Sequence, residues 1–391
     1  PSGNRLHIGI FGKRNSGKSS LLNAITGQEI ALVSEVKGTT TDPVSKAMEI
    51  HPIGPCLLID TAGFDDTGDL GNMRIEKTKA VLDKTDVAVV VFSDMQMELE
   101  TQWIAMLRQR KIPILAVVNQ VDRIEQVQEI KRQIEQRFSL TPLLVRAKEK
   151  TGISQMKHEI LRLMPPDFEA QSLTGSLVQP EDVVLLVMPQ DKQAPKGRLI
   201  LPQVQTIRDL LDNHCVVMCV TTEQLSTALQ ALAKPPKLII TDSQAFAQVY
   251  PLKPAETLLT SFSILLAAYK GDLSAFVKGA NALDSLTDDS HVLIAEACTH
   301  APLQEDIGRV KIPNMLRKKY GEHLQVTVVS GSQFPKDLSE YQLIIHCGAC
   351  MFNRKHVLTR VEQAEQQGVP ITNYGVVLAK LTGILDRISM Q

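Results

Sequence analysis

The sequence predicts an α/β protein with a P-loop domain followed by two smaller α/β domains with mainly parallel sheets. Short apolar runs, which are typical of buried strands, alternate with helical periodicities along most of the chain. The first of these runs leads into a glycine-rich loop and then a helix. A chain of 391 residues is too long for one compact core, and Pro165-Pro166 marks the end of the first domain.

The composition is that of a globular protein and argues against several classes of partner. Apolar residues make up 43% of the chain and the net charge is −1, so no strong field favours nucleic acid or an acidic membrane. No apolar run approaches the roughly 20 residues that span a bilayer. Residues 1–5 lead directly into a strand without the apolar core of a signal peptide. We therefore expect a cytoplasmic protein with no nucleic-acid or membrane partner, and clustering of three of its six cysteines suggests metal binding.

A phosphate-binding loop follows the first expected strand, Leu6–Phe11. Residues 12–19 have the pattern G-x-x-x-x-G-K-S and lead into a helix at Leu21–Ile25. In this setting backbone N–H groups surround the β-phosphate, Lys18 reaches the β/γ oxygens and Ser19 offers a magnesium ligand. The nucleotide-binding residues predicted here are Asn15, Ser16, Gly17, Lys18, Ser19 and Ser20.

The phosphate-sensing motifs of a GTP-hydrolysing protein come next. Residues 38–42 read as a switch loop in which Thr40 completes the magnesium shell. The strand at residues 57–59 ends in a D-x-x-G motif, in which Asp60 holds magnesium through water and Gly63 meets the γ-phosphate. We therefore predict Lys18, Thr40, Asp60 and Gly63 as catalytic residues, with Ser19, Thr40 and Asp60 around the magnesium ion.

Guanine recognition is predicted at the ends of two later strands. The strand at 114–118 ends in Asn119-Gln120-Val121-Asp122, at the place of the N-K-x-D motif. Asp122 can accept two hydrogen bonds from guanine, a pattern that adenine cannot supply. Ala147 and Lys148 follow the strand at 143–145 and fit the weaker S-A-K loop. The expected ligands are GTP and GDP.

This first segment resembles the TrmE–Era–Der group of GTPases, with two departures. Gln120 replaces the lysine of N-K-x-D, so we expect a weakened guanine affinity. Phe64 follows the D-x-x-G motif, where many small GTPases carry a glutamine that orients water. In the resembling group a hydrophobic residue there accompanies potassium activation, which implies that Asn15 binds the ion and that slow hydrolysis is faster in potassium than in sodium. A purely local capping role for Asn15 is the alternative.

We assign the first domain to residues 1–166, a polar linker to 167–179, a small α/β domain to 180–255 and a third domain to 256–391. The middle segment reads βαβαβ without a catalytic constellation, and Cys215 and Cys219 are expected to be core residues. The third segment is expected to begin with helices at 258–269 and 273–283, to continue with strands at 292–297, 324–329, 341–345 and 370–372, and to end with a helix at 376–388.

Two cysteine motifs follow strand ends in the third segment, Cys298-Thr299-His300 and His346-Cys347-Gly348-Ala349-Cys350. Loops at the carboxyl ends of parallel strands converge, so the two motifs can face each other. Gly348 is expected to supply the backbone freedom of the Cys-x-x-Cys turn. Three neighbouring thiolates repel one another, which favours a metal or a cluster as occupant. The residues themselves leave open zinc, held with one histidine, and a 4Fe–4S cluster with one weakly held iron.

The whole arrangement resembles the HydF family, the maturation GTPases of FeFe-hydrogenases. The resemblance implies a 4Fe–4S cluster on Cys298, Cys347 and Cys350, and a scaffold or carrier role for the diiron subcluster of the hydrogenase. It also implies a homodimer through the middle domain, with radical-SAM maturases and the apo-hydrogenase as partners. The candidates for the fourth iron ligand are Glu305, His300 and His346, the last more as a neighbour of the cluster than as a ligand.

Two alternatives stay open. Three cysteines and an open iron also serve iron–sulfur hydrolyases, although no obvious acid–base pair surrounds the motif. The relatives of the first domain suggest a tRNA- or ribosome-directed GTPase with a zinc module. The near-zero net charge and the lack of a basic–aromatic stripe argue against that second alternative.

Overall fold

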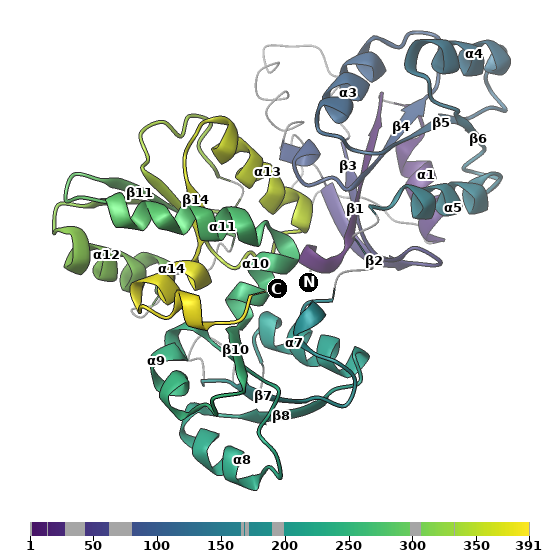
Figure 1. Ribbon diagram of the computed structural model, residues 1–391. Helices are drawn as coiled ribbons and strands as arrows, with labels where there is room; N and C mark the ends of the chain where they lie inside the picture. The colour runs from purple at the N-terminus through teal and green to yellow at the C-terminus, as the bar shows by residue number, and fades with distance from the viewer. Residues whose placement is uncertain are drawn as a thin grey trace. The chain divides into compact units, whose positions relative to one another are not determined.

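The computed structural model divides the chain into two compact units, Pro1–Ala170 and Gln171–Gln391 (Figure 1). The described residues are 2–13, 15–27, 44–61, 80–165, 168, 172–189, 199–297, 306–331 and 333–390. Both units are α/β structures, so the predicted fold class is confirmed. The predicted residues that lie outside the described ranges are Thr40, Gly63, Phe64, Cys298, His300 and Glu305.

The first unit is built on a six-stranded sheet of order β2-β3-β1-β4-β5-β6. All neighbouring strands are parallel except β2 and β3, which are antiparallel. The strands are β1 (Leu6–Gly12), β2 (Val44–Ile50), β3 (Gly54–Asp60), β4 (Val87–Phe92), β5 (Ile114–Asn119) and β6 (Leu143–Val145). The described helices are α1 (Lys18–Thr26), α3 (Glu98–Gln109), α4 (Val127–Phe138) and α5 (Ile153–Leu163).

Helices cover both faces of this sheet, which explains the continuous apolar runs of its central strands. On one face Leu21 of α1 and Ile160 of α5 join the core, and on the other face Trp103 of α3 and Ile134 of α4 do so (Figure 1). The expected strands at 87–92 and 143–145 are found with the same limits. Sequence reasoning did not propose β2, whose polar residues Ser45, Lys46 and Glu49 suit an edge strand.

The second unit contains two four-stranded sheets of order β10-β9-β7-β8 and β12-β11-β13-β14, and every neighbouring pair in both is parallel. The elements of the first are β7 (Val183–Val187), α7 (Leu201–Asp212), β8 (Val216–Val220), α8 (Leu225–Ala231), β9 (Leu238–Thr241), α9 (Phe246–Val249), β10 (Leu258–Ser261) and α10 (Phe262–Lys270). Those that follow are α11 (Leu273–Ala280), β11 (His291–Glu296), a π-helix (Ile307–Lys311), α12 (Ile312–Tyr320), β12 (Gln325–Ser330), β13 (Leu343–His346), α13 (Arg354–Gln366), β14 (Ile371–Asn373) and α14 (Tyr374–Leu381).

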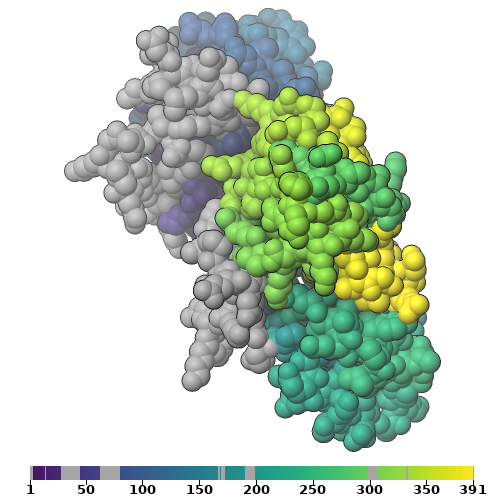
Figure 2. Space-filling view, turned by 90° about the vertical axis from the view of Figure 1, so that its left-hand side faces the viewer, coloured from purple at the N-terminus to yellow at the C-terminus, as the bar shows by residue number. Residues whose placement is uncertain are grey.

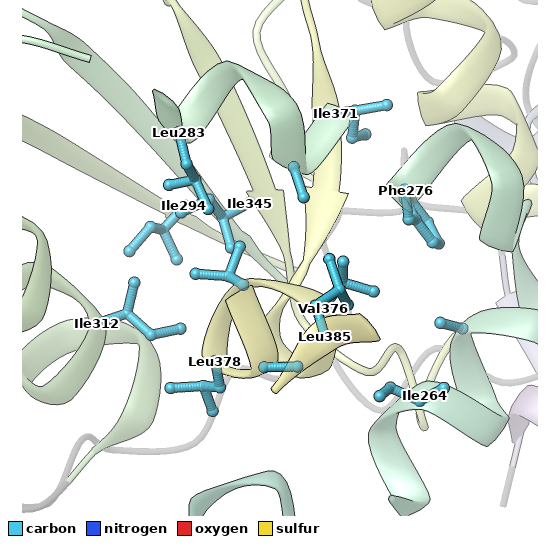
Figure 3. Packing of buried hydrophobic residues seen from close by; sticks show 14 of the residues in the cluster. Ile264, Phe276, Leu283, Ile294, Ile312, Ile345, Ile371, Val376, Leu378 and Leu385 are labelled. Atoms are coloured by element: carbon cyan, nitrogen blue, oxygen red, sulfur yellow. The ribbon is translucent and has the colours of Figure 1, made fainter. Parts of the chain in front are cut away.

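One continuous apolar core joins the two sheets of this unit. Ile239 of the first sheet belongs to the same buried cluster as Ile294 and Ile345 of the second. Figure 3 shows Ile294 and Ile345 among the side chains that converge from strands and helices of this core. The chain's end also returns to the first sheet, because the N–H of Ser389 donates to the carbonyl of Leu259 at 2.7 Å. The yellow C-terminal residues accordingly lie against the teal segment in Figure 2.

Three local expectations are wrong. The helix expected over 258–269 begins only at Phe262, because its first four residues form β10 and Ser261 then caps α10 through the N–H of Ile264. The sheet of β7–β9 therefore extends beyond residue 255. The helix expected over 376–388 ends at Leu381, before Gly383 with a φ of 74°.

The third wrong expectation concerns the middle cysteines. Cys215 is buried as expected, whereas Cys219 is exposed on the edge strand β8, whose residues are all exposed or half-buried. No helix within the described ranges is long and apolar enough to cross a bilayer.

Candidate functional site

The predicted nucleotide residues meet at the carboxyl ends of β5 and β6. Here the structure forms a pocket lined by Ser20, Asn119, Gln120, Asp122, Arg123, Ala147 and Lys148. All of these except Gln120 and Arg123 had been predicted as nucleotide ligands. Arg123 was missed because the N-K-x-D pattern ends one residue earlier. Its position next to Asp122 in the sequence could have indicated that it lines the pocket. Its Nε lies 3.8 Å from Asp122 Oδ2.

Asn119 ties the phosphate-binding loop to the loop after β6. Its fully buried side chain donates from Nδ2 to the carbonyl oxygens of Ser16 at 3.1 Å and Gly17 at 3.3 Å. Its Oδ1 accepts from the N–H of Ala147 at 3.4 Å. Gln120 adds a second link, from Nε2 to the carbonyl of Asn15 at 3.2 Å. Loops far apart in sequence are therefore held together by these two side chains.

Two of the described residues of the phosphate-binding loop have a left-handed backbone. Asn15 has a φ of 65°, which asparagine tolerates better than most residues, and Gly17 has a φ of 83°. A Cβ at Gly17 would lie 2.3 Å from Asn119 Nδ2, so only glycine fits there. Lys18 Nζ lies against the loop's own carbonyls, 2.5 Å from the oxygen of Gly12 and 2.7 Å from that of Lys13.

Two residues predicted as magnesium ligands, Ser19 and Asp60, lie in the described segments. Ser19 is exposed in the first turn of α1, and Asp60 is buried at the carboxyl end of β3. β3 pairs in parallel with β1, the strand that enters the phosphate-binding loop, so Ile10 and Asp60 are register partners. Parallel neighbours present their carboxyl ends on one edge, which brings this carboxylate to the phosphate side of the sheet.

A buried carboxyl group not singled out from the sequence lies beside the same loop. Lys13 Nζ is 2.9 Å from Asp94 Oδ1 and 3.7 Å from Glu100 Oε2, and it also donates to the carbonyl of Gln96. Glu100 is 2% exposed, and burial raises its pKa to about 7. The second residue of the phosphate-binding loop is thus anchored to the connection between β4 and α3.

The second site is the loop after β13, which carries two of the three predicted cluster cysteines. Cys347 Sγ accepts from the N–H of Ala297 at 3.0 Å and from that of Ala349 at 3.4 Å. Burial raises the pKa of Cys347 to about 11, and these two N–H groups oppose that shift. β11 and β13 are parallel neighbours, so their carboxyl ends lie next to each other as predicted. Ala297, which follows β11, directly precedes Cys298 in the sequence.

The turn itself differs from the expectation. Gly348 does not have a positive φ; the left-handed residue is Ala349, with a φ of 52°. The expected need for glycine is therefore wrong, since a Cβ at Gly348 would meet no atom closer than Leu266 Cδ1 at 3.9 Å. Among the described side chains no group of three metal-binding residues occurs, and residues 298–305 are not in that set.

His346 has both ring nitrogens engaged. Nδ1 lies 2.8 Å from the carbonyl of Cys347, which can only accept, so Nδ1 carries the proton. Nε2 then accepts from Arg360 Nη1 at 3.0 Å, since a guanidinium can only donate. Burial, together with the charge of Arg360, lowers the pKa of His346 to about 3. His346 is thus a neutral imidazole without a free lone pair.

Lys270 holds the cysteine loop from the end of α10. Its Nζ, on a side chain 1% exposed, donates to the carbonyls of Ala349 at 3.3 Å, Cys350 at 3.2 Å and Phe352 at 2.7 Å. Burial lowers the pKa of Lys270 to about 8, against the attraction of Cys350 and Cys347. The sequence offered no signal for this residue, because it lies 79 positions before Ala349.

A second cation makes the reciprocal contact. Arg354 Nη1 donates to the carbonyls of Tyr269 at 3.0 Å and Gly271 at 2.9 Å, at the carboxyl end of α10. A positive charge at a helix carboxyl end is favourable, because the last carbonyls have no partner within the helix. The two contacts connect the first sheet's last helix with the cysteine loop of the second sheet.

The chemistry of this loop fits a thiolate-bound, anionic group. Cys347 Sγ receives two backbone N–H donors, and the buried cations Lys270 and Arg360 lie close enough to attract a thiolate at Cys347. The buried Nε of Arg360 has no hydrogen-bond partner within the described part of the chain. The carboxylate of Asp306 caps the π-helix that begins at Ile307. Its Oδ1 accepts from the N–H groups of Gly308 and Arg309, both at 2.9 Å.

Three family models match successive parts of the chain. Residues 7–120 match a model described as a 50S ribosome-binding GTPase. Residues 173–271 match the hydrogen maturase F dimerization domain, and residues 274–390 match the hydrogen maturase F tetramerization domain. The dimerization-domain match ends one residue after α10, and the tetramerization-domain match begins in the first turn of α11.

Two curated GTPases are similar to less than half of the chain. GTPase Der of Wolinella succinogenes is 33% identical over 172 residues, which cover 40% of this chain and 36% of that protein. The tRNA modification GTPase MnmE of Bordetella petrii is 37% identical over 162 residues, which cover 40% of this chain and 33% of that protein. The chain thus spans about a third of the length of these curated relatives.

Solved structures of GTP-binding proteins are similar to part of the chain at low sequence identity. A probable GTP-binding protein engB is 23% identical, covers 40% of this chain and 97% of its own, and has a TM-score of 0.34. An Era variant of Aquifex aeolicus bound to GDP and aluminium fluoride is 18% identical, covers 64% of this chain and 99% of its own, and has a TM-score of 0.36.

Proposed function

Because this chain belongs to the hydrogen maturase F (HydF) family, we propose that it is a GTP-hydrolysing scaffold that binds a 4Fe–4S cluster and assembles or delivers the diiron subcluster of FeFe-hydrogenase. The diiron unit is cargo, and the apo-hydrogenase and radical-SAM maturases are the partners. The observation that carries this proposal is the half-buried Cys347 thiol, which receives two backbone N–H donors, on the same chain as a pocket lined by the residues of the N-K-x-D region.

The proposed nucleotide chemistry uses the residues of the GTPase motifs. Lys18 exchanges its carbonyl partners for the β/γ oxygens, and the loop N–H groups bind the β-phosphate. Ser19 and Asp60, with Thr40, would hold the magnesium ion, which would neutralise charge on the transferred phosphoryl group. Gly63 meets the γ-phosphate, and Asp122 reads guanine in the pocket.

Potassium stimulation rests on Asn15. Its left-handed φ of 65° places an exposed asparagine in the phosphate-binding loop, where the resembling GTPases hold the ion. We expect hydrolysis to be slow and faster in potassium than in sodium, and Asn15→Ala to remove the difference. Asn23→Ala, later in α1, is the matched control. Equal rates in the two salts with the unaltered protein would overturn the role of the ion.

Cys298, Cys347 and Cys350 are the residues that would hold the cluster, which supplies an iron with an exchangeable fourth position. Glu305 and His300 are the candidates for that position. His346 is a neighbour rather than a ligand, because both its nitrogens are already bonded. Electron–nuclear spectra of the reduced cluster distinguish the first two: loss of a nitrogen coupling in His300→Ala assigns the histidine, and an altered signal in Glu305→Ala assigns the carboxylate.

The scaffold role is tested by activation of an apo-hydrogenase. The full chain, reconstituted anaerobically and loaded with a synthetic diiron complex, should activate the enzyme, and Cys298→Ala should not. Cys219→Ala, an exposed cysteine on β8, is the control and should behave as the unaltered chain. Zinc without iron after reconstitution would favour a zinc-containing GTPase of the tRNA- or ribosome-directed class instead.

A homodimer is proposed through the β8 edge of the first sheet in the second unit. β8 is its edge strand, and exposed apolar side chains lie there and on α7: Val216 is 57% exposed, Leu211 55% and Val204 48%. Val216→Lys should give a monomer in sedimentation experiments. Leu252→Lys, at a site 47% exposed and outside β8 and α7, should leave the dimer intact.

A further inference from the structure

Arg360 is a buried cation held in place on several sides. Its side chain is 2% exposed, and its guanidinium lies 4.7 Å from the ring centroid of Phe352 and 4.8 Å from that of Phe334. Nη2 donates to the carbonyl of Gly331 at 2.6 Å, and Nη1 donates to His346 Nε2 at 3.0 Å. Every one of these partners is uncharged, because His346 is neutral.

The charge of this guanidinium is not balanced within the described structure. Arg360 makes no ion pair with a described carboxylate, and its buried Nε has no hydrogen-bond partner among the described residues. A buried cation is unfavourable unless a negative charge lies nearby. Arg360 and a thiolate at Cys347 attract each other. The chain therefore carries a positive charge whose natural counterpart is an anionic group on that sulfur.

We propose that Arg360 is an electrostatic residue of the cluster site, which sets the reduction potential of a cluster bound through Cys347. This inference rests on the proposed function. One-electron reduction adds a negative charge to the cluster, and a nearby cation stabilises the reduced form more than the oxidised form. The low polarity around Arg360, two aromatic rings and buried backbone, leaves that interaction poorly screened.

A purely architectural role makes a different prediction. Arg360 also connects α13 with the end of β13 and with Gly331, so its removal must lower stability in either case. An architectural residue leaves the midpoint potential of an intact cluster unchanged. An electrostatic residue changes the potential according to the charge of the substituted side chain, whatever its effect on stability.

The experiment compares Arg360→Met, Arg360→Gln and Arg360→Lys in the full, anaerobically reconstituted chain. Methionine removes charge and hydrogen bonds, glutamine keeps a donor without charge, and lysine keeps the charge. Midpoint potentials are measured by redox titration with electron paramagnetic resonance, together with iron per chain. Arg317→Met, which removes a half-buried arginine bonded to the carbonyl of Leu324, is the control.

We expect a full iron content with a more negative potential for Met and Gln, and a potential near that of the unaltered chain for Lys and for Arg317→Met. If Met does not retain iron, the comparison of Gln with Lys decides. Two outcomes overturn the proposed role of Arg360 without touching the cluster proposal. They are unchanged potentials in the Arg360→Met and Arg360→Gln variants, and loss of iron from the Arg360→Lys variant as well. An unaltered chain that binds no iron overturns the cluster proposal and, with it, this one.

Discussion

Replacing Asn119 with alanine removes the side chain that joins three loops of the nucleotide pocket. Asn119 is 0% exposed and makes hydrogen bonds to Ser16, Gly17 and Ala147. Alanine keeps the strand but leaves these backbone groups without their partner. We therefore expect both a less stable first unit and a weaker nucleotide site.

The magnitude follows from the burial of each bond. The bonds to the Ser16 carbonyl and from the Ala147 N–H are buried, so each loss leaves a dry polar group and costs about 1–3 kcal/mol. The bond to Gly17 is partly buried and water can replace it, at about 0.5–1 kcal/mol. Because the Ala147 bond is long, 3.4 Å, we take values near the lower end and expect about 3 kcal/mol in total.

Trp103 makes the measurement specific. It is the chain's single tryptophan and is buried in α3 of the first unit, so its fluorescence reports the urea unfolding of that unit. Gln133→Ala, which removes a hydrogen bond to Glu129 on the surface of α4, is the control and should cost less than about 0.5 kcal/mol. Saturating GDP should stabilise the unaltered chain more than Asn119→Ala. A midpoint for Asn119→Ala equal to that of the control would refute the reasoning.

Three further predictions concern the two sites. Gln120→Lys restores the cation of the N-K-x-D motif and should lower the Kd for GDP about tenfold in a titration; an unchanged Kd would contradict the weakened-affinity interpretation. Glu100 has a folded pKa of about 7 against 4.5 for the ordinary group, so the folded state binds the extra proton between these values. The stability of the first unit should therefore fall as pH rises from 4.5 to 7, by up to about 3 kcal/mol, and Glu100→Gln should flatten this dependence in urea titrations; an unchanged slope would argue against it. Lys270→Met should speed hydrogen exchange of residues 347–352 about tenfold, which corresponds to about 1.4 kcal/mol of local stability, whereas the exposed Lys278→Met should not.

Much of the nucleotide site was predictable because its signals are local. The G-x-x-x-x-G-K-S loop and the strands at 87–92 and 143–145 are encoded in short stretches, and the structure has them at the expected places. Strand β10 was missed because its four apolar residues continue into the apolar sequence of α10, so periodicity could not separate strand from helix. The exposure of Cys219 was missed because it depends on which elements cover β8.

The cysteine loop shows where local information ends. The sequence alone shows the thiols of this loop, the imidazole beside them and their position after strand ends. It also shows that a phosphate-binding loop precedes them in the chain. The tertiary structure decided that His346 has no free nitrogen, that Ala349 rather than Gly348 makes the turn, and that Lys270 and Arg360 lie buried beside the loop. Burial and pairing of charges depend on segments far apart in the chain, and only folding brings those segments together.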